Sequence, residues 1–347
     1  MNETAFSVLS NQRITEWFGQ DTFYNIISVM VWFMLGIGII GIIGNILTII
    51  VYIKLGFSET IHMSYLALAV SDHCIIITTM WCSICYFPLI KMFLNRFQIA
   101  TDVGLFANFT GVWPHFAFSK TTALITAWIS LERCLCVVFP IKVKLLITRS
   151  VTKLVLLIIF VIGCGPVVFA YIGRKSEWRF DPLRNQTKFY IFGDGVKDLN
   201  LLNRFAFVLY GVVYPVFSWV SVIVCTSFLI IKLRRSATWR KQNINDSPIH
   251  RDQVHERRIF TRTSRVTKTV VIVAIIFIVC SFPISLNLFY STFEREYSLN
   301  GNLRYLILLN ASFILLLSEI NSSVNIIVFS VMGTRFRSTL LEILCRK

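Results

Sequence analysis

The chain has 347 residues, a mean hydropathy of +0.68 and a formal net charge of +16. Only 15% of its residues are charged, well below the roughly 25% that is usual for a soluble globular protein. This composition excludes an ordinary soluble domain. The apolar residues form runs long enough to cross a bilayer, for which a helix needs about 20 residues.

Seven such runs lie near residues 25–53, 63–90, 111–139, 151–173, 202–231, 267–292 and 305–331. Lipid cannot hydrogen-bond free backbone groups, so each run is predicted to be helical and the fold to be an all-α seven-transmembrane helix bundle. A transmembrane β-barrel would show alternating segments of roughly 10 residues, and none is visible. The predicted parts are an extracellular segment (1–24), a seven-transmembrane domain (25–332) and an amphipathic helix with a short cytoplasmic tail (333–347).

The basic residues predict the orientation in the membrane. Loops on one side carry 21 Lys and Arg residues and loops on the other side carry 12. The more basic side is expected to be cytoplasmic, which places the N-terminus outside and the C-terminus inside a multi-pass protein of the plasma membrane. The positive charges flank lipid spans in separate loops, so we expect membrane lipid, and not nucleic acid, as their partner. Asn2 and Asn185 begin Asn-x-Thr triplets on the outer side and are predicted glycosylation sites.

Polar residues inside the spans cost insertion energy and are usually functional. In chain order, the motifs are Gly44-Asn45, the segment from Leu66 to Asp72, Glu132-Arg133-Cys134 with Val137 and Pro140, Pro215, Phe277 with Cys280 and Pro283, and the segment from Asn321 to Phe329. Together they resemble the motifs of rhodopsin-like (class A) G-protein-coupled receptors across most of the chain. The departures are Cys134 and Phe329, which replace tyrosines of the family pattern, and Ile326, which replaces a proline.

Within that family, LERCLCVVFPIKVKLLITRS and the divergent seventh span resemble invertebrate chemosensory receptors, especially molluscan ones, and neighbouring invertebrate neuropeptide receptors. The resemblance implies a receptor that binds a small-molecule or peptide ligand outside the cell and activates a heterotrimeric G protein. A chemosensory role is expected, and a neuropeptide receptor is the alternative.

The resemblance also implies a switch at the inner end of the third span. There Glu132 would hold Arg133 in an inactive arrangement, and the other switch positions are Pro140, Phe277, Pro283, Asn325 and Phe329. The alternative is an interfacial ion pair with no switching role. Thr263, Ser281 and Ile223 stand where the family has an acid, an aromatic residue and a tyrosine, which predicts a shifted balance between the off and on states.

Asp72 is an acid in the middle of the membrane, and the resemblance surrounds it with oxygen ligands. These are Asn45, Thr122, Asn321, Ser322 and Asn325. Oxygen-rich shells suit small hard cations, and the family binds sodium there. The alternative is a protonated Asp72 in a hydrogen-bond network without an ion. We expect no other cofactor.

Two further charges lie inside the spans. Unpaired, Lys120 and Glu319 would each cost about 2.5–3.5 kcal/mol on insertion scales. We therefore expect Glu319 to pair with His115 or Lys120 and a polar ligand to engage the group. A purely structural salt bridge is the alternative.

After the seventh span, one apolar face predicts a helix on the inner leaflet, with Phe336, Leu340, Leu341 and Leu344 on that face. Cys345 beside it is either palmitoylated or unmodified.

Three other kinds of protein fit the sequence less well. An enzyme is not expected, since the chain has no metal-binding HExxH, no phosphate loop and no paired nucleophile and base. A retinal-based light sensor would need a lysine in 305–331, which has none. A transporter or a seven-helix ligand-gated channel would lack the Glu132-Arg133 motif. A transporter would also show two related halves, and such a channel would place the N-terminus inside.

Overall fold

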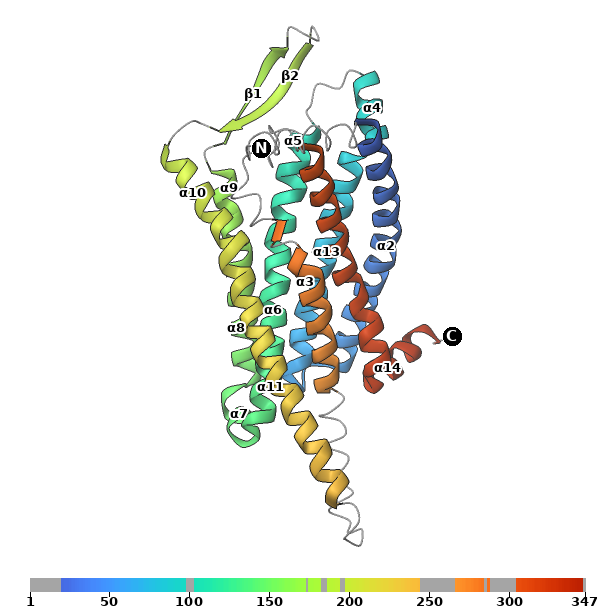
Figure 1. Cartoon of the computed structure of the whole chain (residues 1–347), viewed down its shortest axis with the longest axis vertical. Helices are drawn as coiled ribbons and strands as arrows, with labels where there is room; N and C mark the ends of the chain where they lie inside the picture. Colours follow the sequence, from blue (N-terminus) through green and yellow to red (C-terminus); the bar gives the residue numbers. More distant parts are fainter. Residues whose placement is uncertain are drawn as a thin grey trace, which may run out of the picture.

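The computed structural model describes residues 20–97, 103–172, 174–181, 186–193, 197–243, 266–283, 286–287 and 304–345. Seven helices in these ranges are long and apolar enough to cross a membrane. They are Thr22–Leu55, Thr60–Tyr86, Asn108–Val138, Arg149–Tyr171, Phe205–Lys232, Val266–Pro283 and Tyr305–Met332. They stand side by side along the long axis of the molecule (Figure 1). The predicted seven-helix bundle is confirmed.

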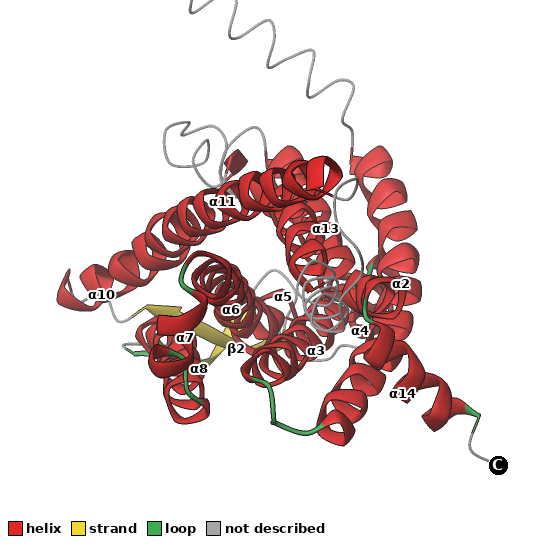
Figure 2. Ribbon diagram, turned by 90° about the horizontal axis from the view of Figure 1, so that it is seen from below, coloured by secondary structure: helices red, strands yellow, loops and turns green. Residues whose placement is uncertain are grey.

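The first three spans follow α2 (Gln20–Leu55), α3 (Thr60–Tyr86) and α6 (Trp113–Val138). A π-helical turn (Asn108–Val112) leads into α6, and the short helices α4 (Pro88–Arg96) and α5 (Val103–Ala107) lie between α3 and that turn. Seen from below, α6 lies toward the middle of the bundle (Figure 2). It contacts α3, α8 and α11. Side chains of α6 can therefore reach three other spans.

The remaining spans are built from shorter pieces. The fourth joins α8 (Arg149–Cys164), a 3-10 turn (Gly165–Val167) and α9 (Val168–Tyr171). The fifth joins α10 (Lys197–Val208), a π-helical turn (Leu209–Val213) and α11 (Tyr214–Asn243). The sixth is described over Val266–Pro283, and the seventh lies in α13 (Arg304–Met332). The rest of the predicted 267–292 span lies largely outside the described residues.

Two helix ends are set by prolines. The second span was predicted to continue to residue 90, but α3 ends at Tyr86, and Phe87 has an extended backbone (φ −63°, ψ 125°). Phe139, after α6, also leaves the helical region (φ −127°, ψ 65°) before α7 (Pro140–Leu146) begins. A residue that precedes proline is pushed out of the α region by the proline ring. Pro88 and Pro140 therefore each end one helix and begin the next.

The all-α description needs one correction on the outer side. Between the fourth and fifth spans, β1 (Arg174–Asp181) pairs antiparallel with β2 (Gln186–Gly193), so that Arg174 lies opposite Gly193 and Asp181 opposite Gln186. The rings of Trp178 and Phe189 lie 5.3 Å apart across this hairpin. From the sequence, this segment was expected only as a loop between two spans.

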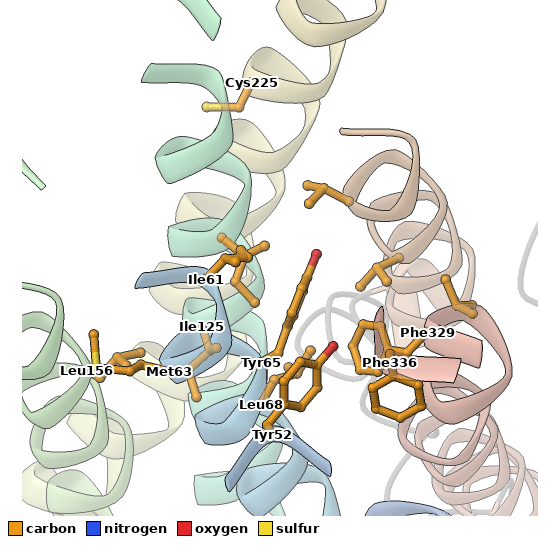
Figure 3. Close-up of a cluster of buried hydrophobic side chains, with 14 of the residues drawn as sticks. Tyr52, Ile61, Met63, Tyr65, Leu68, Ile125, Leu156, Cys225, Phe329 and Phe336 are labelled. Atoms are coloured by element: carbon orange, nitrogen blue, oxygen red, sulfur yellow. The ribbon is translucent and has the colours of Figure 1, made fainter. Parts of the chain in front are cut away.

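The largest apolar cluster lies at the inner half of the bundle (Figure 3). Its aromatic part contains Tyr52 of α2, Tyr65 of α3 and Phe329 of α13, and Phe336 of α14 (Thr334–Leu344) completes it. The Tyr65 and Phe329 rings are 4.7 Å apart, and the Tyr52 and Phe336 rings 5.3 Å. The predicted C-terminal helix is present, and it is anchored on the bundle by an aromatic side chain.

Candidate functional site

The inner end of α6 carries a buried ion pair. Arg133 donates from Nη2 to Glu132 Oε1 at 2.7 Å, and the Glu132 side chain is fully buried. Two hydroxyls of α3 also donate to this carboxylate, Thr60 to Oε1 and Ser64 to Oε2 at 3.0 Å. Through these hydrogen bonds, the Glu132 carboxylate links Arg133 to the inner end of α3. The predicted contact is present, while its role as a switch stays a prediction.

Thr60 and Ser64 were not among the residues predicted from the sequence. Their spacing could have indicated them, because residues four apart lie on one face of a helix, and here that face carries two hydroxyls at the start of the second span. Near this network, Tyr65 Oη and Arg133 Nε are buried and have no hydrogen-bond partner in the described part of the chain. The network thus holds the guanidinium through one nitrogen and leaves another unbonded.

The other predicted switch positions lie at separate places. Phe277 is buried in a small cluster with Ala123, Ala127, Val222 and Ala274, between the third, fifth and sixth spans. Pro283 is the last residue of the described sixth span, and Pro140 begins α7. Thr263 lies outside the described residues.

Ser281 stands where the family has an aromatic residue, and α11 places an aromatic side chain next to it. The indole Nε1 of Trp219 donates to Ser281 Oγ at 2.8 Å, and its ring lies 5.9 Å from the ring of Phe282. An aromatic side chain therefore occupies this level of the bundle, but it comes from the fifth span.

Asp72 is fully buried and accepts hydrogen bonds from two other helices. Ser322 Oγ lies 3.1 Å and Thr122 Oγ1 3.2 Å from Oδ1, and Asn325 donates from Nδ2 to Oδ2 at 2.7 Å. Asn45 supports this shell indirectly, by donating to the Ser322 backbone carbonyl at 3.0 Å.

The donor set fits a small hard cation. Carboxylate and hydroxyl oxygens are the ligands that such ions prefer, and Thr122 and Ser322 each place a hydroxyl within 3.2 Å of Asp72 Oδ1. Asn321, which was predicted to join this shell, makes no hydrogen bond to Asp72. Four of the five residues placed around Asp72 therefore come together, directly or through one intermediate.

The predicted group of His115, Lys120 and Glu319 does not assemble. All three side chains are buried, but His115 Nδ1 lies 3.0 Å from Thr79 Oγ1 instead. Glu319 forms no ion pair with either cation, and its two carboxylate oxygens have no hydrogen-bond partner among the described residues. Spacing along each helix placed these residues inside the bundle correctly. Which neighbour each one faces depends on how the helices are rotated.

Of the three predicted modification sites, one lies within the described residues. Asn2 and Asn185 lie outside the described residues. Cys345 is an exposed free thiol immediately after α14. On α14, Phe336 and Leu340 pack on the inner cluster, whereas Leu341 and Leu344 are exposed on its surface, as suits a helix that lies at a membrane interface.

A seven-span bundle with this inner ion pair and this buried acid is the architecture of a membrane receptor, and comparison with known families gives the same answer. The chain matches the model of the 7 transmembrane receptor (rhodopsin family) over residues 44–329. It belongs to this family.

Among the proteins it resembles are mammalian receptors. It is 24% identical over 324 residues to growth hormone secretagogue receptor type 1 of Rattus norvegicus and of Mus musculus, with 88% of this chain and 78% of the relative covered in each case. The receptor of the same name from Mustela putorius furo is also 24% identical, over 327 residues. The expected likeness to invertebrate receptors has no counterpart among these matches.

Proposed function

We propose that this protein is a plasma-membrane receptor that binds an extracellular ligand and activates a heterotrimeric G protein through Arg133. The observation that carries the proposal is the Glu132–Arg133 pair at the inner end of α6, in a chain of the rhodopsin receptor family. In the structure, Glu132 holds Arg133 and is itself held by α3. Movement of α3 against α6 would weaken this hold and free a permanently charged, multidentate donor for the G protein.

On the outer side, the proposed ligand site lies among His115, Lys120 and Glu319. The three are buried polar groups on α6 and α13, without an ion pair between them. A polar ligand would supply the partner that the Glu319 carboxylate lacks among the described residues. The β1–β2 hairpin lies beyond the outer ends of the helices, above this part of the bundle (Figure 1).

The class of ligand has two candidates. The chemosensory role rests on the segment around Arg133 and on the divergent seventh span. The names of the relatives describe receptors for growth hormone secretagogues, not for odorants. This observation favours the alternative, a receptor for an endogenous signal such as a neuropeptide.

For Asp72 we propose a sodium site formed with Thr122 and Ser322. Its support is the convergence of a carboxylate and two hydroxyls inside the membrane. A bound sodium ion would supply the positive charge that a buried carboxylate otherwise lacks. Asn325 would then position the carboxylate, because it already donates to Oδ2.

The test of coupling is ligand-free signalling in a heterologous cell. We would compare wild type with Arg133→Ala at matched surface expression and use Arg149→Ala, an exposed arginine on the same side, as the control. A basal signal that falls with Arg133→Ala and persists with Arg149→Ala supports the proposal. An unchanged signal in Arg133→Ala contradicts it.

If no basal signal is seen, a screen of peptides and odorants with a promiscuous G protein follows in the same cells. A hit whose response Arg133→Ala abolishes supports coupling, and its chemical class decides between the two candidate roles. A hit that signals equally well without Arg133 contradicts the proposed switch.

A further inference from the structure

Glu319 is an exception among the fully buried acids in the described part of the chain. Its side chain is 0% exposed, and neither Oε1 nor Oε2 has a hydrogen-bond partner within the described ranges. Glu132 and Asp72, the other fully buried acids, each accept at least three hydrogen bonds. A buried charge is normally paired or coordinates a cation, because leaving water is otherwise very costly. Glu319 has neither in the described part of the chain.

The carboxylate lies in a place shaped by two other helices. A methyl group built on Gly38 of α2 would come within 2.6 Å of Glu319 Oε1 and 2.7 Å of the Met80 side chain of α3. Glycine at position 38 therefore leaves the space that the carboxylate fills. Helices α2, α3 and α13 all contact one another (Figure 2), so Gly38, Met80 and Glu319 come from three neighbouring helices.

A second unbonded oxygen lies one turn further along α13. Ser323 Oγ is buried without a hydrogen-bond partner, and a methyl group on Gly41 would come within 2.2 Å of it. Glu319 and Ser323 thus present oxygens to the same glycine face of α2. The hard cation Ca²⁺ binds oxygens at about 2.3–2.6 Å, so an ion of that size spans oxygens roughly 5 Å apart. One helical turn rises about 5.4 Å.

This place is separate from the site around Asp72. Met80 follows Asp72 by eight residues on α3, so it lies roughly 12 Å nearer the outer end of that helix. Ser322 bonds to Asp72, while Ser323 is rotated by about 100° around α13 and faces α2. The oxygens of Asp72 accept hydrogen bonds from three donors, whereas those of Glu319 accept none from the described residues.

We propose that Glu319 and Ser323, packed against Gly38 and Gly41, form a second intramembrane site that binds a monovalent cation. The cation is either a free sodium ion or the ammonium group of an extracellular ligand, since both bring one positive charge to a carboxylate. The sodium case does not depend on the proposed receptor function, and the ammonium case rests on it.

The experiment is thermal unfolding of the purified full-length protein in detergent. Sodium and methylammonium are titrated separately at constant ionic strength, with N-methyl-D-glucamine as the bulky reference cation. The Asp72→Asn background removes the carboxylate of the other site. A ligand that binds only the folded state raises the melting temperature with its concentration, so a saturable rise in this background is the expected result.

Three variants test whether the rise in melting temperature comes from cation binding at Glu319. Glu319→Gln is expected to lower the apparent cation affinity by about tenfold or more, since bonds to charged groups contribute about 1.5–3 kcal/mol. Gly38→Ala should weaken it as well, because the added methyl takes the space beside Oε1. Gly36→Ala is the matched control: nothing lies within 4 Å of its added methyl, so the response should be kept.

The outcomes distinguish a free sodium ion from the ammonium group of a ligand, and both from the absence of a cation site. A rise with sodium assigns the site to a free ion, and a rise with methylammonium alone assigns it to the ammonium group of a ligand. No rise with either cation, or equal rises with and without Glu319→Gln, would overturn the proposal and leave Glu319 as a neutral buried acid. If the Asp72→Asn protein does not fold, wild type should show two saturable sodium steps and Glu319→Gln one. Unfolding needs no G protein, so failure here is distinct from failure of coupling.

Discussion

Removing one hydroxyl should shift this receptor toward its active state. Ser64 Oγ donates to Oε2 of Glu132 at 3.0 Å, and both side chains are fully buried. Ser64→Ala deletes this donor and leaves the carboxylate oxygen unsatisfied, while Arg133 and Thr60 still bond Oε1. Hydrogen bonds to charged groups contribute about 1.5–3 kcal/mol.

The size of the effect follows from which state makes the bond. If only the inactive arrangement makes it, the ratio of active to inactive receptor rises by about 10- to 150-fold, since 1.4 kcal/mol corresponds to a factor of ten. A receptor that is about 1% active without ligand would then become roughly 10–60% active. Basal signalling would approach the level of ligand-stimulated signalling.

The assay is basal G-protein activation at matched surface expression, with Ser130→Ala as the control. Ser130 is also a fully buried serine near the inner end of α6, but its hydroxyl has no hydrogen-bond partner in the described residues. Its replacement removes the same atoms and no bond, so basal signalling should not change. Equal basal signals from the two variants would refute the reasoning. A lower melting temperature without higher signalling would show that both states make the bond.

Two further predictions concern packing, and thermal unfolding measures both. Gly163→Ala should destabilise the protein by about 1–3 kcal/mol, because its methyl would come within 3.1 Å of an α6 backbone atom, whereas Gly165→Ala meets nothing within 4 Å and should be neutral. Phe336→Ala should cost about 3–5 kcal/mol, because this ring is 2% exposed and anchors α14, whereas Leu344→Ala removes a side chain that is 59% exposed and should cost little.

The helices were predictable because hydrophobic length alone specifies a membrane span. Their ends were less so, since apolar residues continue past Tyr86 and only Pro88 marks the break. The β1–β2 hairpin was missed because charged residues interrupt its strands, and the expected alternation of polar and apolar residues is weak there. Hydropathy predicts what enters the bilayer, and says little about how the segments outside it fold.

Within the site, prediction succeeded where a motif specified both partners. Asp72 and Asn325 come from separate helices and meet as expected. It failed for Glu319, whose expected partners stand on α6, because the glycines of α2 allow that helix to approach α13 closely and the carboxylate lies beside Gly38 instead. The lack of a side chain at a glycine of one helix thus determines where an acidic side chain of another helix lies. The periodicity of residues within either helix does not reveal this.

The inner end of the bundle depends on aromatic packing where the family uses hydroxyls. Phe329 and Ile223 lack the phenol groups of the family pattern, yet Phe329 is 2% exposed and its ring lies 4.7 Å from Tyr65 and 5.7 Å from Phe336. Aromatic pairs contribute about 0.5–1.5 kcal/mol each beyond their buried area. Any movement of this end of α13 must therefore break contacts with α3 and α14 together. Because Tyr65 follows Ser64 on α3, the helix that packs on Phe329 is also the helix that holds Glu132. If Arg133 is released as proposed, we expect this release to be coupled through α3 to rearrangement of the seventh span.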